Sequence, residues 1–320
     1  MDLIPHRRLE VYSGRSHPAL ARDITRHLGV ELGQPNLDQF ANSETYCRYD
    51  ESVRGSDVFI IQTHAKPVND SIMEQCIMID AAKRASGKRI TAVCPYYGYS
   101  RQDRKSRGRE PITAKLVADI LAAAGANRIV SVDLHAGQIQ GFFDGPVDHL
   151  SAMPVLVERL AHDGPPNLRV VAPDAGRLKV AERFAQHLGA GLASVWKRRT
   201  GGRVESLGVM GDVAGRHCVL IDDMIDTAGT VVAAADALLA HGAVEVWVMA
   251  THAVLSDPAI DRLKNSAIAK VIVTDTLPLP SEKRIDKIEV LSVAPLIADA
   301  IGAVFEDTSV SDIFGGENQS

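Results

Sequence analysis

The chain has 320 residues, enough for about two domains of ordinary size. Hydrophobic residues make up 46% of it and charged residues 23%, and no apolar run approaches the roughly 18 residues that cross a membrane. The formal net charge is −5, so no overall basic field would attract nucleic acid, and we expect neither nucleic acid nor a membrane as a partner.

The first predicted elements are a short strand from Leu9, a polar loop and an apolar-periodic helix that ends in His-Leu-Gly at Gly29. The same order of elements returns from Leu168 and ends in His-Leu-Gly at Gly189. The two glycines are 160 residues apart (189 − 29), half of the chain. A repeat of this length is too long for a solenoid, so it predicts two copies of one domain.

Apolar strands support the same duplication. The run "DVFIIQT" (57–63) is matched at the same offset by "HCVLIDD" (217–223). Continuous Val/Ile-rich strands alternate with helices, such as the one predicted over 111–125, which begins with Pro and ends at Gly. This alternation is typical of parallel sheets covered by helices on both faces. The predicted fold class is therefore α/β, with two duplicated domains, each a mainly parallel sheet flanked by helices.

We expect an N-terminal domain over residues 1–150 and a C-terminal domain over 151–304. A C-terminal segment over 305–320 is expected to pack back on the N-terminal domain and to end in a disordered tail. In sheets of this kind, ligands bind beyond the carboxyl ends of the strands. Acidic residues or a histidine follow three of the predicted strands: Asp133 with His135, Asp174, and Asp222 with Asp223.

The run "CVLIDDMIDTAGT" (218–230) is the strongest indication of a ligand site. It leads from an apolar strand into a predicted helix, whose first amide groups and nearby hydroxyls suit a phosphate group. Adjacent carboxylates can accept hydrogen bonds from a vicinal diol. The pattern indicates a 5-phosphoribosyl site formed by Asp222, Asp223, Asp226, Thr227, Ala228, Gly229 and Thr230. The alternative is an ordinary helix cap with solvated acids, although a cap needs only one of the three.

Two basic clusters interrupt the acidic chain, "SRQDRKSRGRE" (100–110) and "WKRRTGGR" (196–203). A charge run is usually a solvated surface. Arginine side chains also fit phosphate oxygens, and the glycines of the second cluster suggest a mobile flap.

The acidic run resembles the phosphoribosyl pyrophosphate loop of the phosphoribosyltransferase fold. Four further runs resemble the ribose-phosphate pyrophosphokinase family, and the similarity covers residues 9–314, nearly the whole chain. They are "FANSETYCRYDESVRG" (40–55), "YYGYSRQDRKSRGREPITAKL" (96–116), "DLHAGQIQGFFDGPVD" (133–148) and "SVSDIF" (309–314). The resemblance implies transfer of the β,γ-diphosphoryl group of ATP to the C1 hydroxyl of ribose 5-phosphate, giving phosphoribosyl pyrophosphate and AMP.

The resemblance also implies a role for each matching residue. ATP-binding positions are Phe40, Asn42, Ser43, Glu44, Arg101, Gln102, Asp103 and His135. Lys197 is the implied catalytic residue, and Arg199 is its partner and a contact of ribose 5-phosphate. His135 and Asp174 match the family's Mg²⁺-binding positions, although Mg²⁺ prefers oxygen ligands. The residues alone identify no general base, and Asp222, Asp223 and Asp226 all stay candidates.

Two positions depart from the family pattern. Arg177 replaces a second glycine after Asp-Ala-Gly, so it either binds phosphate itself or alters the loop. Trp196 stands where the family tends to be polar. One alternative hypothesis is a catalytically silent regulatory homologue. Another is a nucleotide-salvage phosphoribosyltransferase, which would need neither an ATP loop nor the run at 133–148.

Family resemblance further implies a homo-oligomer, a hexamer built from dimers, with a possible allosteric site for ADP and phosphate. The matching segments include Arg54, Gln138, Asp144 and residues 309–314, where Asp312 departs from common family choices. The N-terminus shows no apolar signal region. The cysteines, Cys47, Cys76, Cys94 and Cys218, are widely spaced, so we expect free thiols and a cytoplasmic protein.

Overall fold

The structure is a computed structural model that describes residues 7–200 and 203–314, without the side chains of residues 197–207. It divides into two compact units. Unit 1 comprises Met1–Ser151, Thr276–Pro278 and Val293–Ser320, and unit 2 comprises Ala152–Asp275 and Leu279–Ser292. The division differs from the predicted domain boundaries, because residues 276–278 and 293–304 fall in unit 1.

Unit 1 is built on a six-stranded parallel sheet in the order β2-β1-β5-β6-β7-β8. Its strands are β1 (Leu9–Ser13), β2 (Leu32–Gly33), β5 (Asp57–Ile61), β6 (Arg89–Cys94), β7 (Arg128–Val132) and β8 (Val147–Leu150). Its helices are α1 (Pro18–Leu28), α2 (Val68–Arg84), α3 (Thr113–Ala124), α8 (Ala294–Glu306) and the short 3₁₀ turns η1 (Gly137–Gly141) and η4 (Val310–Phe314). Strands β3 (Asn36–Gln39) and β4 (Thr45–Arg48) form a separate antiparallel hairpin.

Unit 2 has a seven-stranded sheet in the order β11-β10-β9-β12-β13-β14-β15, parallel except for the β10–β11 pair. Its strands are β9 (Leu168–Ala172), β10 (Gly191–Thr200), β11 (Arg203–Met210), β12 (His217–Ile225), β13 (Glu245–Ala253), β14 (Lys270–Thr274) and β15 (Ile288–Leu291). Its helices are α4 (Met153–Asp163), α5 (Leu178–Leu188), α6 (Gly229–Ala240), α7 (Ala259–Asn265) and the 3₁₀ turns η2 (Ala175–Arg177) and η3 (Ser281–Lys283).

The two sheets repeat one topology, which confirms the predicted fold class. Strands β1, β5, β6, β7 and β8 of unit 1 stand in the same order as β9, β12, β13, β14 and β15 of unit 2. Gly29 and Gly189 end α1 and α5 in the left-handed conformation, with φ of 68° and 59°. Because a side chain strains that conformation, glycine is favoured at both helix ends.

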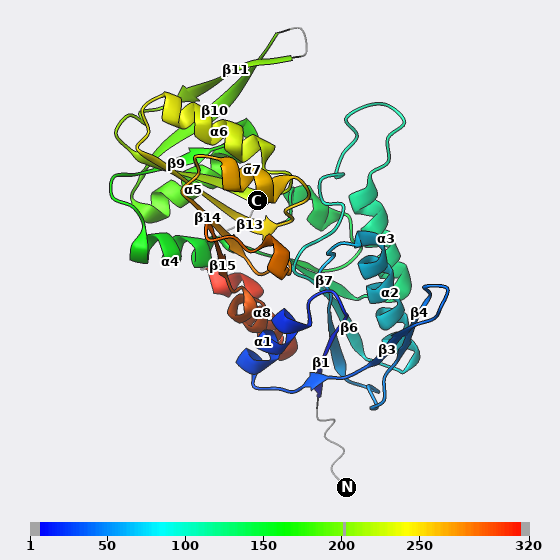
Figure 1. Ribbon diagram of the computed structural model, residues 1–320. Coiled ribbons are helices and arrows are strands. Elements are labelled where there is room, and N and C mark those ends of the chain that lie inside the picture. The colour runs from blue at the N-terminus through cyan, green and yellow to red at the C-terminus, as the bar shows by residue number, and fades with distance from the viewer. Residues whose placement is uncertain (1–6, 201–202, 315–320) are drawn as a thin grey trace. The chain divides into compact units, whose positions relative to one another are not determined.

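The core of each unit lies between its sheet and its helices. In unit 1, buried residues of α2 and α3, such as Ile79 and Leu121, pack on Val58 and Ile60 of β5. Figure 1 shows α1 and α8 side by side on the opposite side of this sheet from α2 and α3, and α1 contacts α8. Burying one Leu or Ile side chain in such a contact contributes about 1.5–3 kcal/mol to the stability of the fold. The contact with α1 explains why α8 belongs to unit 1.

The cysteines are free thiols, as expected, with Cys76, Cys94 and Cys218 buried and Cys47 partly buried. Burial raises the pKa of the Cys218 thiol to about 11, which keeps it protonated and unreactive near neutral pH. Within the described residues, no helix combines the length and apolar character needed to cross a membrane.

Candidate functional site

The acidic run lies at the carboxyl end of β12, as the sequence predicts. Strand β9 pairs with β12 only up to Leu220, whereas β13 continues alongside it to Ile225. The backbone of Asp222 and Asp223 therefore faces the loop that follows β9 on one side. That loop supplies Arg177, whose Nε lies 3.2 Å from Asp222 Oδ1 and whose Nη2 lies 2.5 Å from Asp223 Oδ1.

The two carboxyl groups strongly affect each other. Burial, followed by the neighbouring charge of Asp223, raises the pKa of Asp222 to about 8, although Arg177 acts in the opposite direction. The N–H of Asp223 donates to Asp222 Oδ1 at 2.9 Å. An acidic pair with one cation between its members is thus already assembled at this strand end. The sequence predicted the acids here but not their ion pairs with Arg177.

The remaining loop residues lead into α6, again as predicted. Ala228 is the N-terminal cap of this helix and has a left-handed backbone with φ of 61°. Arg262 of α7 donates through Nη1 to the carbonyl of Thr227 at 2.9 Å, which ties the loop to the neighbouring helix. Gly229 is the first helical residue, and Thr230 follows it. The free amide groups at such a helix start form a natural anion site.

The predicted flap is the hairpin of β10 and β11 at the edge of the unit 2 sheet, where Figure 1 shows it projecting from that sheet. The backbone of Lys197 pairs with Leu207, and the register shifts between Arg198 and Arg199. The side chains of Lys197 and Arg199 lie outside the described part of the structure. Their catalytic roles therefore remain predictions.

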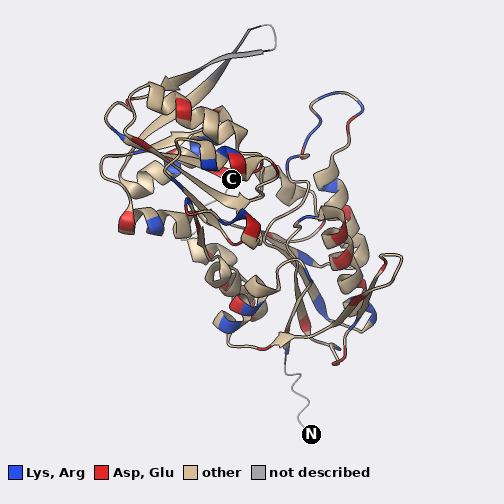
Figure 2. Cartoon of the chain, in the orientation of Figure 1, with Lys and Arg blue, Asp and Glu red and all other residues tan. Residues whose placement is uncertain are grey.

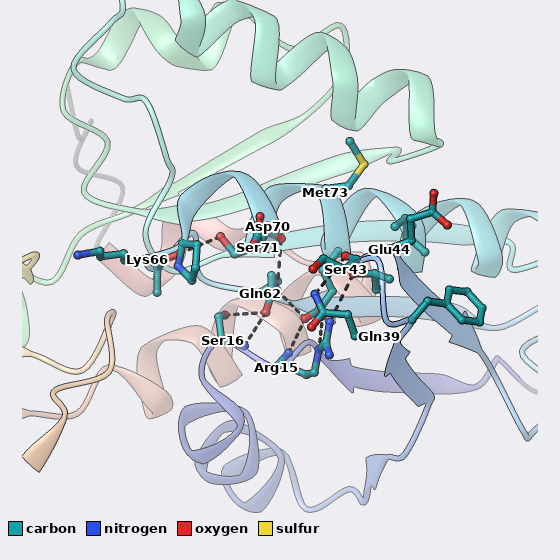
Figure 3. Close-up of a pocket in the computed structure, with 16 residues that line it drawn as sticks. Arg15, Ser16, Gln39, Ser43, Glu44, Gln62, Lys66, Asp70, Ser71 and Met73 are labelled. Carbon is teal, nitrogen blue, oxygen red and sulfur yellow. Dashed lines mark hydrogen bonds and ion pairs between the residues drawn. The ribbon is translucent and has the colours of Figure 1, made fainter.

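In unit 1, part of the predicted ATP-binding set lines a cavity of about 790 Å³ between the β3–β4 hairpin and α2 (Figure 3). Phe40, Ser43 and Glu44 line it, and the exposed Phe40 ring packs edge-on against Tyr46 at 6.0 Å between centroids. Asn42 instead shapes the hairpin turn, because its Oδ1 accepts from the Glu44 N–H at 3.2 Å.

The floor of this cavity is a polar network that sequence reasoning missed. Glu74 is buried and accepts from the backbone N–H of Arg15 at 2.7 Å and from Gln62 Nε2 at 2.9 Å. Gln62 Oε1 in turn accepts from Ser16 Oγ at 2.6 Å, as Figure 3 shows. The duplication could have indicated these residues, because the ends of β1 and β5 correspond to those of β9 and β12.

The other predicted ATP-binding residues do not line this cavity. Arg101, Gln102 and Asp103 lie on the loop between β6 and α3, where Figure 2 shows several Lys and Arg positions close together. Gln102 Oε1 accepts from Thr113 Oγ1 at 2.6 Å, and the buried Asp103 accepts from Gln138. His135 follows β7. The structure thus brings together only part of the predicted ATP set.

The two predicted metal ligands belong to different units, His135 to unit 1 and Asp174 to unit 2. Asp174 Oδ1 caps η2 by accepting from the Gly176 N–H at 2.9 Å, and the residue is exposed. Among the described residues, no group of three or more His, Cys, Asp or Glu side chains is placed to hold a metal ion. An exposed carboxylate fits a Mg²⁺ ion that takes its other ligands from substrate phosphates and water.

Comparison with known proteins identifies the family of the chain. Residues 9–125 match the model of the N-terminal domain of ribose phosphate pyrophosphokinase, and residues 202–315 match the phosphoribosyl synthetase-associated domain. The ribose-phosphate pyrophosphokinases of Bifidobacterium longum and Streptomyces avermitilis are 57% and 56% identical to this chain. The alignments cover 97% and 96% of this chain and 93% and 96% of the relatives.

A solved structure from the same family is also similar to this chain. The crystal structure of phosphoribosylpyrophosphate synthetase from Mycobacterium smegmatis superposes with a TM-score of 0.89 at 51% identity. The match covers 94% of this chain and 100% of that one. Sequence similarity over nearly the full length and a shared fold lead to one conclusion: the chain belongs to the ribose-phosphate pyrophosphokinase family.

Proposed function

We propose that this chain is a ribose-phosphate diphosphokinase, which transfers the β,γ-diphosphoryl group of ATP to the C1 hydroxyl of ribose 5-phosphate. The products are phosphoribosyl pyrophosphate and AMP. The observation that carries the proposal is the end of β12, where an acidic pair leads directly into the start of α6. Relatives that share more than half of their residues with this chain are ribose-phosphate pyrophosphokinases, so a catalytically silent homologue is not favoured.

Ribose 5-phosphate is assigned to this end of unit 2. The 5-phosphate is held by the amides and hydroxyls of residues 226–230, where the dipole of α6 favours an anion. Asp222 and Asp223 accept hydrogen bonds from the vicinal hydroxyls of the ribose ring. Arg199 is a further contact of the sugar phosphate.

ATP is assigned to the loops of unit 1. Phe40 offers an aromatic face for the adenine ring, with Asn42, Ser43 and Glu44 at its edges. Arg101 and Gln102, with Asp103 beside them, contact the phosphates, and His135 is placed near them. Mg²⁺ bound by His135 and Asp174 would neutralise non-bridging phosphate oxygens. The exposed carboxylate of Asp174 suits that role.

The reaction forms a bond between the C1 oxygen of the sugar and the β-phosphorus as the C1 hydroxyl loses its proton, and it breaks the bond from the β-phosphorus to the oxygen that leaves with AMP. Asp222, Asp223 and Asp226 are the candidates to accept that proton. Such a transfer depends on alignment and on stabilisation of the charge that develops on the phosphates. Lys197 and Arg199 of the flap are assigned this stabilisation. Closure of the hairpin over the phosphates would bring both cations to the reacting groups.

The test is to incubate the protein with ATP, ribose 5-phosphate and Mg²⁺ and to measure AMP. We expect AMP only when the sugar phosphate is present; production of ADP, or of no nucleotide, would reject the proposal. Lys197→Ala should lower kcat by about 10²–10³-fold, as loss of one stabilising group does elsewhere, while ATP still binds. Lys179→Ala, an exposed change on α5, is the matched control and should keep full activity.

We also propose a cytoplasmic homo-oligomer, a hexamer built from dimers, with an allosteric site for ADP and phosphate. Free thiols suit a reducing compartment. The allosteric segments are assigned to Arg54, Gln138, Asp144 and residues 309–314. Sedimentation velocity would test the assembly. Titration of activity with ADP at saturating ATP would test regulation, because inhibition there cannot come from simple competition.

A further inference from the structure

Arg177 occupies an unusual place in unit 2. Its guanidinium group lies between two carboxyl groups on the neighbouring strand, with one nitrogen directed at each. Nε is 3.2 Å from Asp222 Oδ1, and Nη2 is 2.5 Å from Asp223 Oδ1. The exposed fractions of the three side chains are 15%, 18% and 6%, so this contact is shielded from water. A surface ion pair of mobile side chains would not show such burial.

The backbone around Arg177 fixes this geometry. Strand β9 ends at Ala172, and η2 begins at Ala175, stabilised by the Asp174 carboxylate that accepts from the Gly176 N–H. Arg177 is the last residue of η2 and precedes the first residue of α5. Its side chain therefore starts from a rigid junction between a strand and a helix. From there it reaches the end of β12, which pairs directly with β9.

Chemistry explains what a cation does at this point. Two adjacent carboxylates in a buried site repel each other, and one of them readily takes up a proton. A protonated carboxyl group becomes a donor and loses acceptor capacity, whereas ionised carboxylates only accept hydrogen bonds. Guanidinium stays charged at all relevant pH values and has donors spaced to serve two acceptors. Arg177 thus favours the form of the pair that can accept from sugar hydroxyls.

We propose that Arg177 is a positioning residue for ribose 5-phosphate, which acts by holding the carboxyl groups of Asp222 and Asp223 in fixed rotation toward the vicinal hydroxyls of the sugar. This inference rests on the proposed function of the β12 end. It makes Arg177 part of sugar recognition and gives it no contact with ATP. The alternative, in which Arg177 leaves the acids and binds a phosphate group, predicts a different kinetic result.

The experiment compares wild type with Arg177→Met and Arg177→Lys in steady-state assays of AMP release. For Arg177→Met we expect KM for ribose 5-phosphate to rise about tenfold or more, since a lost charged hydrogen-bonding partner is worth at least that factor. KM for ATP should change less than about twofold, because the proposal gives Arg177 no contact with ATP and changes at separate sites act nearly independently. Arg177→Lys keeps the positive charge but lacks the paired N–H donors of the guanidinium group. Its KM for ribose 5-phosphate should therefore lie between those of wild type and Arg177→Met.

A substrate analogue gives a readout that general loosening of the fold would not change. Wild type should strongly prefer ribose 5-phosphate over 2-deoxyribose 5-phosphate, because a site built to bind a hydroxyl rejects the analogue that lacks it. Arg177→Met should lose most of that preference. Lys179→Met, a change at an exposed residue of α5 two positions away, is the control. It should keep the wild-type KM for ribose 5-phosphate and the wild-type preference over the 2-deoxy analogue.

The outcomes separate the possible failures. An increase in KM for ATP with KM for ribose 5-phosphate unchanged would overturn the inference in favour of a phosphate contact. An unchanged preference for the ribose in a folded Arg177→Met protein would overturn it as well. If Arg177→Met does not fold, as judged by circular dichroism, the Arg177→Lys constants decide by the same criteria. Absence of AMP from wild type itself would instead reject the proposed function.

Discussion

Trp196 lies across the backbone of Gly208, its partner on the opposite strand of the β10–β11 hairpin. A Cβ atom at position 208 would come within 2.3 Å of the indole ring, so only glycine leaves room for the ring in this position. The indole is 45% exposed, which means that it covers the strand without being part of the core. Trp196 directly precedes Lys197 on β10, so this contact lies beside the backbone of the proposed catalytic residue.

We therefore expect Gly208→Ala to displace the indole and shift the backbone of the flap beside Lys197. Because small misplacements of reacting groups cost up to about 10²-fold, kcat should fall about tenfold or more. The melting temperature should change little, since the ring contributes little buried area. Fluorescence of Trp196 in a Trp247→Phe background would report the displacement. Gly141→Ala is the control, because a Cβ there meets nothing within 4 Å; unchanged fluorescence and kcat in Gly208→Ala would contradict the prediction.

The duplicated fold could be predicted because its signals are local. Gly29 and Gly189 end equivalent helices, and the apolar residues of β5 and β12 are buried, with His217 and Asp222 of β12 partly exposed. Each signal is contained in a few consecutive residues. The start of α6 at the end of "DDMIDTAGT" was predictable for the same reason, because strand, loop and helix follow one another directly.

Contacts between distant segments could not be predicted. Arg177 meets Asp222 and Asp223 because β9 stops short of the end of β12, and strand lengths depend on pairing that a single strand does not encode. Glu74, Arg15 and Gln62 meet for a similar reason. The unit to which α8 belongs was also missed, since an apolar helix face does not specify which surface covers it.

The raised pKa of Asp222, about 8, predicts a change of stability with pH. The folded state holds a proton that the unfolded chain releases above pH 4, so the contribution of this group is complete at low pH and is lost as pH rises through 8. Asp222→Asn cannot ionise. We expect it to melt about 2–4 °C above wild type at pH 9, as for a gain near 1 kcal/mol, and to show no gain at pH 5.

Thermal melting of the ligand-free proteins between pH 5 and pH 9 would measure this difference. Asp236→Asn on the exposed side of α6 is the control and should follow wild type at every pH. If Asp222→Asn raised the melting temperature equally at pH 5 and pH 9, ionisation of Asp222 would not be the cause of the higher stability.

Two acidic residues in unit 1 pair with the same two arginines but should contribute differently to the free energy of unfolding. Asp57 is buried and accepts from Arg7 Nη2 at 2.9 Å and from Arg89 Nε at 2.8 Å. Asp307 pairs with both arginines from an exposed position. Asp57→Ala removes the buried acceptor, while both arginines are more than a third exposed and keep Asp307, so it should cost about 1–3 kcal/mol. Asp307→Ala should cost under about 1 kcal/mol. Urea unfolding would compare the two, and equal costs would contradict this ranking.

His64 in unit 1 is buried as the neutral ring, with both nitrogens hydrogen-bonded. Nδ1 accepts from the Gly98 N–H at 2.8 Å, so Nε2 carries the proton and donates to Gln75 Oε1 at 2.9 Å. Gln75 Nε2 then donates to the carbonyl of Ile60 at 3.2 Å. Burial lowers the pKa of His64 to about 4. Stability from this neutral ring is therefore complete above pH 6.5 and is lost as pH falls toward 4.

We expect His64→Ala to lower the free energy of unfolding by about 1–3 kcal/mol at pH 7.5, because Gly98 and Gln75 lose a buried partner. This loss of stability should be smaller at pH 5. There the unfolded wild-type chain gains a proton on His64 that the folded protein does not bind, which destabilises wild type but not His64→Ala. Urea unfolding at both pH values measures the difference, with the exposed His27→Ala as control. A deficit that grows on acidification would mean that the ring is stabilised in its charged form, against the acceptor role that the Gly98 N–H imposes on Nδ1.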